Sequence, residues 1–305
     1  MKSSIIIVNR NGANFLRVGL PSVIAAVRYT GVEHEIIVVD DGSQDESVRV
    51  IRKEFPEVKL VALNQNQGFG KACNIGVEHS QNPIVIMLNN DMVVEEDFLN
   101  PLLTPFINED IFAVACQVKK WDKQTIEIGL TRAKFKFGFI KINRNVNLVN
   151  MDIPQSTFFA SGGAAAYSKE KYLILDGFDE LYHPFYWEDV DLSYRAWKRG
   201  WQVFYQPHSV VYHKHQGTIG KSFKKSYVKE IYYRNRFLFI WRNITDWHYL
   251  KQHFFWLLPY LLINMLIGKF YYLRGLCCAL QKISQIKEKK KIDKDLQRIS
   301  DINIF

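Results

Sequence analysis

The stretch "EIIVVDDGS", residues 35–43, decides the fold, because four consecutive β-branched apolar residues run directly into two aspartates, a glycine and a serine. Such a run predicts a strand that is buried on both faces and ends in a polar turn. Helical stretches at residues 15–29, 47–55 and 71–79 separate it from similar runs: "SIIIV" (4–8), "VKLVAL" (58–63) and "PIVIMLNND" (83–91). The alternation predicts an α/β fold with a mostly parallel sheet and helices on both faces.

Polar side chains follow these predicted strands at the points where they end. Ligands of parallel sheets bind at the carboxyl ends of the strands, so we expect a crevice there that accepts an anion and a metal. Turn chemistry alone explains part of the pattern, since Asn, Asp and Gly favour turns. The residues are Asn9, Arg10 and Asn11 after the first strand, Asp40 and Asp41 after the second, and Asn89, Asn90 and Asp91 after the fourth.

The composition is that of a folded globular chain, with 48% hydrophobic residues among 305 and a formal net charge of +9. Between Lys198 and Lys251, eleven bases face only Glu230 and Asp246. This stretch matches an anionic partner, either an acidic membrane surface or a phosphorylated substrate, and a solvated basic face is the alternative. No nucleic-acid-binding motif accompanies it, so we expect no nucleic acid partner.

Two features bear on the cellular compartment. The apolar stretch in "MKSSIIIVNRNG" (1–12) is too short for a signal peptide. The four cysteines show neither metal-ligand spacing nor a disulfide framework. We therefore expect a cytoplasmic protein with reduced cysteines.

The segment "FFASGGAAAYSKE" (158–170) is unusual for its run of small residues around Gly162 and Gly163. Residues without large side chains let the backbone come close to a bulky group. A tightly packed strand and turn is the alternative interpretation.

The segment "FYWEDVDLSYRAWKRG" (185–200) crowds three carboxylates, Glu188, Asp189 and Asp191, at the start of a predicted helix. Helix capping explains such a cluster, whereas catalysis needs a carboxylate that is partly buried and held near other charge. Asp191 is expected to be structural or to pair with Arg195 one helical turn further on.

The last part of the chain changes character. "HFFWLLPYLLINMLIG" (253–268) is almost wholly apolar, is broken by Pro259 and precedes the charged "KEKKKIDKDLQR". About 20 apolar residues are needed to cross a bilayer, so we expect a helical tail over 241–305 that associates with a membrane surface without crossing it. The competing interpretation is an apolar helix buried against the domain or a homodimer partner.

Six segments, taken in order, resemble family 2 glycosyltransferases, the inverting enzymes of the Rossmann-like GT-A fold, with the rhamnosyltransferase-like branch as the nearest type. They are "VDDGSQDES" (39–47), "NQGFGKACNIG" (66–76), "MLNND" (87–91), "SGGAAAYSKE" (161–170), "GFDELYHPFYWEDVDLSYRAWKRG" (177–200) and "VVYHKHQGT" (210–218). The resemblance implies a GT-A domain over 1–240, with a nucleotide-sugar-binding half (1–105), an acceptor-binding half (106–240), and the tail beyond it.

The resemblance also implies a donor site in the crevice. Asp40 and Asp41 match an acidic pair that accepts hydrogen bonds from a uracil or thymine N–H and from ribose hydroxyls. Asn89 is an expected ribose or sugar contact, and Arg10, which stands where relatives usually carry an aromatic residue, is a hypothetical partner of the diphosphate. The other expected donor-site residues are Asn9, Lys71, Asn74, Asn90, Gly162 and Gly163.

A divalent cation, Mg or Mn, is the implied cofactor. "NND" (89–91) stands where the family has a D-x-D metal motif, which makes Asp91 the expected ligand. His213 matches a histidine that approaches the same metal or diphosphate, whereas its neighbour His215 is not expected to. Such cations commonly take one or two carboxylates together with phosphate oxygens of the substrate.

Asp189 is by resemblance the base that deprotonates the acceptor hydroxyl, and Glu188 shapes its charge state or holds acceptor hydroxyls. A neighbouring like charge and burial among aromatic residues raise a carboxylate's pKa, while a helix N-terminus lowers it.

We therefore expect sugar transfer from a UDP- or dTDP-linked donor to a growing glycan or a polyprenyl-diphosphate-linked acceptor, by a protein peripheral at the inner face of the cell membrane. Two alternatives stay open. A sugar nucleotidyltransferase would carry a Gly-rich, basic phosphate loop near its N-terminus, which this sequence lacks. A catalytically inactive GT-A-fold membrane scaffold is favoured by Asn89 in the metal motif.

Overall fold

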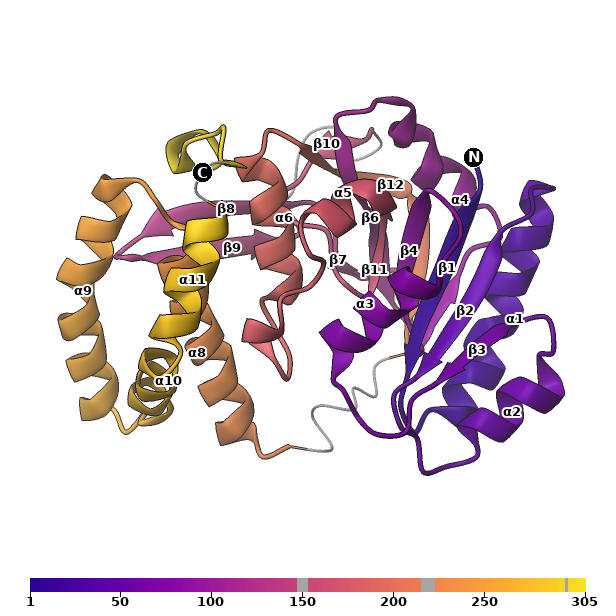
Figure 1. Cartoon of the computed structure of the whole chain (residues 1–305), viewed down its shortest axis with the longest axis horizontal. Helices are drawn as coiled ribbons and strands as arrows, with labels where there is room; N and C mark the ends of the chain where they lie inside the picture. Colours follow the sequence, from indigo (N-terminus) through magenta and orange to yellow (C-terminus); the bar gives the residue numbers. More distant parts are fainter. Residues whose placement is uncertain (147–152, 215–222, 294–295) are drawn as a thin grey trace.

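A computed structural model describes residues 1–146, 153–214, 223–293 and 296–305 of the chain. His215, named in the sequence, lies outside these residues. A mixed sheet forms the centre of the larger part of the molecule (Figure 1). Its strands run in the order β10 (Gln155–Ser156), β12 (Gln202–His213), β6 (Ile111–Lys120), β11 (Ala164–Ser168), β4 (Ile84–Asn89), β1 (Ser3–Asn9), β2 (Glu35–Asp40) and β3 (Lys59–Ala62), with β5 (Met92–Val94) beside β12 and β7 (Ile126–Ile128) beside β6.

Strands β3, β2, β1 and β4 are parallel, as are β6 and β12, while β11 runs antiparallel between β4 and β6. The prediction of a mostly parallel sheet is confirmed. The register pairs Asn9 with Asp40, and Val8 with Asn89. The polar ends of the three strands therefore lie side by side, as expected for one crevice.

Helices cover both faces of this sheet. Successive side chains of a strand point to opposite faces, so each buried strand contributes apolar side chains to both layers of helices. Ile5 and Ile7 of β1 belong to the core under α1 and α4, whereas Ile6 belongs to the core under α3 and α6. The predicted helices are confirmed. The helices of this part are α1 (Ala13–Thr30), α2 (Ser47–Glu54), α3 (Phe69–His79), α4 (Leu99–Leu103), α5 (Lys169–Ile174) and α6 (Glu188–Lys198), with the 3₁₀ turns η1 (Thr104–Ile107) and η2 (Glu180–Tyr182).

A third apolar core lies at the other end of the molecule, where the C-terminal helices meet a hairpin (Figure 1). It joins Tyr194 of α6, Phe139 of the hairpin, Phe237 of α8 and Tyr272 of α10. The elements are α8 (Lys225–Asn243), α9 (Trp247–Leu266), α10 (Tyr271–Leu280), α11 (Ile283–Asp293), η4 (Asp301–Asn303) and the hairpin β8 (Thr131–Lys136) and β9 (Phe139–Arg144). The division of the chain at residue 240 stays a prediction, and α8 runs across that position.

Helix α9 runs unbroken through Pro259, the residue that interrupts the apolar run of the sequence. Proline removes one backbone hydrogen bond from a helix interior. Leu257, Tyr260 and Leu261 pack against the third core and hold the helix on both sides of this gap. No helix within the described ranges is long and apolar enough to cross a membrane.

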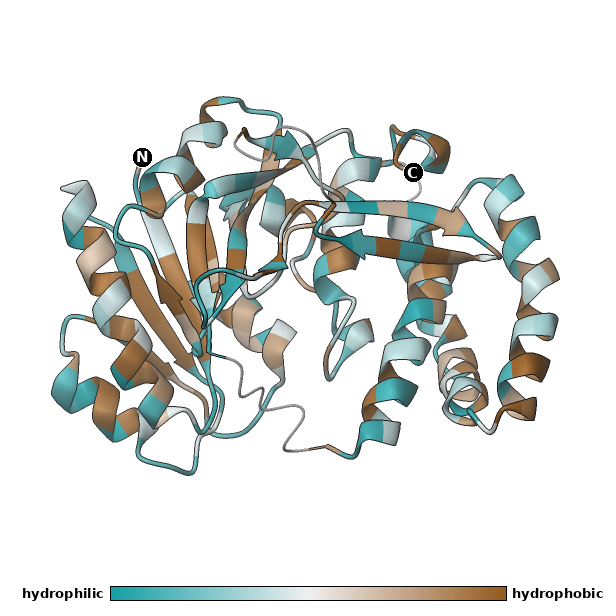
Figure 2. Cartoon of the chain, turned by 180° about the vertical axis from the view of Figure 1, so that it is seen from behind, coloured by the Kyte–Doolittle hydropathy of each residue, from teal (hydrophilic) through white to brown (hydrophobic). Residues whose placement is uncertain are grey.

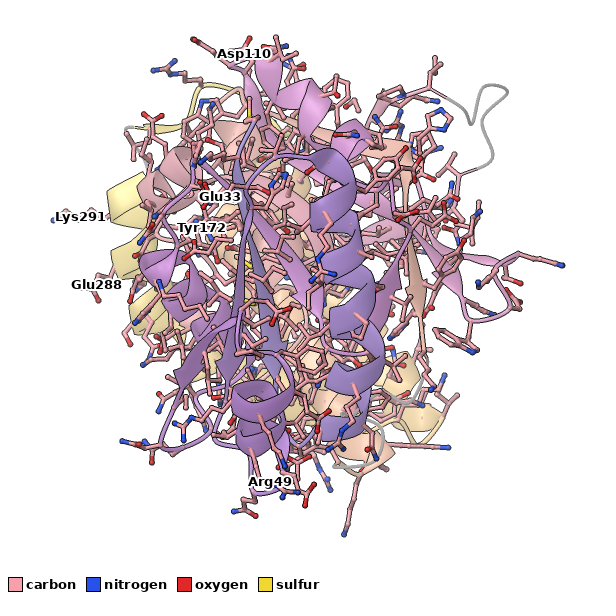
Figure 3. All side chains as sticks on the ribbon, turned by 90° about the vertical axis from the view of Figure 1, so that its right-hand side faces the viewer. Glu33, Arg49, Asp110, Tyr172, Glu288 and Lys291 are labelled. Atoms are coloured by element: carbon pink, nitrogen blue, oxygen red, sulfur yellow. The ribbon has the colours of Figure 1, made fainter. Side chains whose placement is uncertain are left out.

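Charged side chains lie around the outline of the molecule when it is viewed from the α1 end, as the labelled Arg49, Asp110, Glu288 and Lys291 illustrate (Figure 3). Asp301 near the C-terminus is the opposite case, because it is fully buried. It accepts hydrogen bonds from Tyr194 Oη (2.5 Å) and Lys198 Nζ (2.9 Å) of α6, and from the backbone N–H of Thr245 (2.7 Å). The end of the chain is thereby fastened to α6 and to the start of the α8–α9 connection.

Replacing Asp301 by Ala should lower the free energy of unfolding by about 3–5 kcal/mol, because it leaves the buried Lys198 charge without its partner. Urea unfolding measures the change. Glu33→Ala is the control, since Glu33 pairs with Lys2 at the surface, where ion pairs contribute little to stability. A loss for Asp301→Ala no larger than that of the control would contradict the prediction.

Candidate active site

Three of the predicted crevice residues form one hydrogen-bonded row across the strand ends. Asn9 is fully buried at the end of β1, and its Nδ2 donates to Asp40 Oδ2 at 2.8 Å. Its Oδ1 accepts from Asn90 Nδ2 at 2.7 Å. Asp40 also accepts from the backbone N–H of Ser43 at 2.9 Å and so shapes the turn after β2. The row joins the ends of β1, β2 and β4 and fixes the floor of the crevice.

Asp41 is buried and engaged with the chain's own backbone. Its Oδ1 accepts from the N–H of Gln67 at 2.6 Å, and its Oδ2 from the N–H of Gly68 at 3.1 Å. This carboxylate therefore holds the loop that leads into α3. A carboxylate offers about four lone-pair directions, so both aspartates retain capacity to accept further hydrogen bonds.

Two expected donor-site residues lie on α3. Lys71 is in its first turn and pairs with Glu180 at 3.4 Å, and it lines a hollow together with His183 and Glu188. The amide of Asn74 is bonded within the protein: its Oδ1 accepts from the N–H of Phe178 at 2.9 Å, and its Nδ2 donates to the Phe178 carbonyl at 2.9 Å. A direct contact of Asn74 with the nucleotide is not supported by this geometry, because both of its polar atoms already order the loop before η2.

The two glycines predicted from the small-residue run lie between the two acidic parts of the site. The N–H of Gly162 donates to Asp189 Oδ2 at 3.3 Å, and the carbonyl of Gly163 accepts from the N–H of Asn89 at 2.9 Å. A Cβ added to Gly163 would lie 2.5 Å from the Asn89 amide. The bulky groups that need this close approach are thus the protein's own: the Asn89 amide at Gly163, and the rings of Phe178 and Phe69 at Gly162.

Asp91 and His213 meet, as expected from the sequence. His213 Nε2 lies 3.1 Å from Asp91 Oδ2, although the two residues are 122 positions apart. His213 Nδ1 lies 3.0 Å from Glu127 Oε2, a carboxylate that the sequence did not single out. Burial lowers the pKa of His213, but the hydrogen bonds and charges of Asp91 and Glu127 outweigh this effect and raise the pKa to about 9.

These residues fit a divalent cation. Asp91 Oδ1 is buried and has no hydrogen-bond partner in the described part of the chain, which leaves one carboxylate oxygen available as a ligand. Among those residues no group of three or more His, Cys, Asp or Glu side chains has the geometry to hold a metal by itself. The remaining ligands would come from substrate oxygens and water, as is common for Mg and Mn. Binding would require His213 to lose its proton.

Glu188 and Asp189 begin α6 and are half-buried, and the Oε2 atom of Glu188 is inaccessible to water. Burial raises the pKa of Glu188 to about 8, with a further contribution from the charge of Asp189. Burial also raises the pKa of Asp189, but the Gly162 N–H and the positive charge of Arg144 oppose that rise. Glu188 therefore keeps its proton near neutral pH, while the Gly162 N–H and Arg144 favour the ionised form of Asp189 against the effect of burial.

The structure also settles the role of Asp191, and it adds a residue that the sequence did not single out. Asp191 is fully buried, and its Oδ2 accepts from Arg195 Nε at 2.7 Å, which confirms the predicted i, i+4 pair. Arg144, at the end of β9, acts electrostatically on Asp189. Neither Arg144 nor Glu127 carried a sequence signal, because each lies in a segment without a recognisable motif and meets its partner only in the folded chain.

Comparison with known proteins gives this geometry its context. The sequence profile described as "Glycosyl transferase family 2" matches residues 4–173. The chain is 22% identical over 229 residues to the O-antigen chain rhamnosyltransferase RfbN of Salmonella typhimurium, covering 74% of this chain and 70% of the relative. It is 26% identical over 246 residues to polypeptide N-acetylgalactosaminyltransferase 3 of Taeniopygia guttata, covering 73% of this chain but only 39% of that relative's length.

Solved structures share the fold. S. aureus TarS 1–349 in complex with UDP-GlcNAc aligns with a TM-score of 0.60 at 16% identity, over 95% of this chain and 84% of that one. GalNAc-T7 with UDP, GalNAc and Mn²⁺ aligns with a TM-score of 0.60 at 19% identity, over 79% and 47% of the two chains. The sheet and its covering helices are thus those of the GT-A fold. Because the family profile matches more than half of the sequence, the chain belongs to glycosyl transferase family 2.

Proposed function

We propose that this chain is an inverting glycosyltransferase that moves a sugar from a nucleoside diphosphate sugar, UDP- or dTDP-linked, to a hydroxyl of a growing, lipid-linked surface glycan. The observation that carries the proposal is the Glu188–Asp189 pair, held at the glycine backbone that also touches the Asn89–Asp91 segment. Membership of the family and the likeness to a relative named as an O-antigen chain rhamnosyltransferase support it.

Asp189 acts as the general base. Its carboxylate takes the proton of the acceptor hydroxyl while that oxygen bonds to the anomeric carbon, and the bond from this carbon to the nucleoside diphosphate breaks on the opposite face. A base must be ionised to do this, and the Gly162 N–H and Arg144 favour its ionised form. Glu188, which keeps its proton, donates a hydrogen bond to the acceptor.

The donor occupies the crevice at the ends of β1, β2 and β4. Asp41 and Asp40 accept from the base and ribose, and Arg10, half-buried just beyond β1, pairs with the diphosphate. Asp91 and His213 would hold a divalent cation, which when bound neutralises charge developing on the leaving diphosphate. The N and O donor set admits Mg or Mn.

The lipid-linked acceptor is inferred from α9, whose outward side is strongly apolar. Figure 2 shows brown, hydrophobic segments on this helix at the far edge of the molecule. Large apolar side chains remain exposed on α9 and just after its end, namely Trp247, Phe254, Phe255, Leu258, Leu262, Ile263, Met265, Leu266, Ile267 and Phe270. The sequence from 247 to 287 holds no acidic residue but has Lys251, Lys269, Arg274, Lys282 and Lys287. An apolar side with bases and no acidic residue between 247 and 287 suits an anionic membrane surface.

The β8–β9 hairpin extends this surface. Phe137 at its tip is 46% exposed and packs edge-on against Trp256 of α9, with 5.1 Å between ring centroids. The Nζ atoms of Lys136 and Lys141 lie 5.0 and 5.4 Å from the centroid of the Phe137 ring. We define the exposed apolar residues between Trp247 and Phe270, together with Phe137, as the lipid-facing surface, which would place the site beside its membrane-bound acceptor.

Asp189→Asn should lower the transfer rate by about 10²–10⁴-fold, since general-base catalysis contributes that much, and should leave nucleotide binding intact. Turnover with a mixed set of donors measures the rate. Thermal unfolding with UDP or dTDP and Mn²⁺ measures binding, and Asp91→Ala should abolish the metal-dependent part of the stabilisation, about 2.7 kcal/mol at a hundred times the dissociation constant. Nucleotide binding without turnover in the wild type would instead support the inactive scaffold.

Glu188→Gln should make the protein less sensitive to rising pH. The folded chain keeps the Glu188 proton up to about pH 8, whereas in the unfolded chain it is lost near 4.5. Stability of the wild type therefore falls between these pH values, because the folded state binds more protons than the unfolded state. The variant should lose about 3–4 kcal/mol less than the wild type between pH 5 and pH 8, because one pKa unit corresponds to about 1.4 kcal/mol. Urea unfolding at both pH values tests this, and parallel losses would contradict a raised pKa at Glu188.

Phe255→Ser combined with Leu258→Ser should weaken binding to anionic phospholipid vesicles by about tenfold or more, because each side chain contributes about 1.5–3 kcal/mol when buried. Vesicle co-sedimentation measures this. Ile107→Ser, which alters an 80% exposed apolar residue of η1, is the matched control and should bind like the wild type. If the wild type ignores vesicles and forms a dimer that the double variant dissociates, the surface is an interface between copies of the chain.

A further inference from the structure

The two residues before Glu188 have an unusual backbone. Tyr186 has a φ of 71° and Trp187 a φ of 78°, both in the left-handed region. Bulky L-residues adopt this region rarely and at a cost, and glycine is the residue that favours it. Two such aromatic residues in succession persist only where the surrounding structure holds them there.

Asn235 of α8 is the polar side chain that meets this turn. It is fully buried, and its Nδ2 lies 2.8 Å from the carbonyl oxygen of Tyr186, 3.0 Å from that of Phe185 and 2.8 Å from that of Tyr182. Its Oδ1 accepts from Arg234 Nε at 2.9 Å, which sets the direction in which the amide faces. One amide group thus contacts carbonyl oxygens at both ends of the segment 182–186.

Helix α8 also fixes the side chain of the second strained residue. Trp187 is 4% exposed, and its ring packs against Phe239 and Tyr232, with 5.2 and 5.8 Å between centroids. The same helix therefore holds both the carbonyls before the turn and the ring within it. Glu188 and Asp189 follow directly, so the direction of these two carboxylates depends on the turn.

We propose that Asn235 is a positioning residue: it holds the left-handed turn at Tyr186–Trp187 and so aims Glu188 and Asp189 into the crevice. This inference rests on the proposed function, because it assigns the catalytic step to those carboxylates. Asn235 itself does not reach the substrate. A hydrogen-bond donor is required at this place. In aspartate an acceptor oxygen would take the place of Nδ2 and face the three carbonyl oxygens.

The test compares Asn235→Ala and Asn235→Asp with the wild type. Both should lower kcat by more than tenfold, and Asn235→Asp at least as much as Asn235→Ala. The donor Kd should stay within about twofold, because the donor crevice is built from the ends of β1, β2 and β4. The matched control is Asn264→Ala, which removes another buried asparagine whose Nδ2 bonds within α9, to the Tyr260 carbonyl at 2.7 Å. Its kcat should equal that of the wild type.

A second change separates positioning from a general loss of folding. Tyr186→Gly places a residue at φ 71° that adopts this conformation freely, so it should restore several-fold of the kcat lost in Asn235→Ala. Purely multiplicative effects of the two substitutions would overturn the proposal, as would a kcat of Asn235→Ala equal to that of Asn264→Ala.

Failure of the proposed function would look different. If the wild type itself shows no turnover with any donor, the transferase assignment fails while the turn can still be tested. The melting temperature of the double variant Tyr186→Gly/Asn235→Ala should then exceed the value expected from adding the two single shifts. Additive shifts would show that Asn235 does not hold the turn.

Discussion

The buried charge of Asp191 is the constraint on which the second half of the molecule depends. This carboxylate is inaccessible to water and accepts from Tyr182 Oη, Arg195 Nε and Asn243 Nδ2, each at 2.7 Å, with Arg242 beside it. A buried charge is tolerated only when its partners surround it in good geometry. Helix α6 can therefore take one position relative to the preceding loop and to α8, and this position brings its first turn to the end of the sheet.

The two ends of the acidic cluster on α6 consequently have opposite properties. Asp191 is fully paired and faces the interior, whereas Oε2 of Glu188 is buried without a partner in the described part of the chain. An unpaired buried carboxyl group favours its neutral form, so ionising Glu188 costs free energy. The two residues before it, Tyr186 and Trp187, have a strained backbone. The two unfavourable features therefore lie next to each other in the chain. The stable network behind them compensates for both, which is the usual arrangement at a site that must be held in a reactive geometry.

The third core connects the candidate active site to the exposed apolar face of α9. Helix α8 supplies Asn235 to the turn and Phe237 to the core that it shares with α10 and the β8–β9 hairpin. Asp301 accepts a hydrogen bond from Tyr194 and so fixes the C-terminal segment against α6. The C-terminal helices are therefore packed parts of the structure that shapes the site, and the exposed apolar face of α9 is attached to them.

The sequence by itself determined the strands, the helices that cover them and the meeting of Asn9, Asp40 and Asn89 at one edge, because these follow from local hydrophobic periodicity and parallel pairing. It also determined the Asp191–Arg195 pair, since helix geometry alone brings residues four apart together. The ordered motifs pointed to Asp91, His213 and the Glu188–Asp189 pair.

Only the tertiary structure decided which partners these residues meet. The contact of His213 with Glu127, the hydrogen bonds of Asn74 to the loop at Phe178, and the contact of Asn235 with the turn at Tyr186 each join residues 49 or more positions apart. The continuity of α9 through Pro259 likewise depends on packing. Such contacts are set by how whole elements pack against one another, and no local pattern of residues encodes that packing.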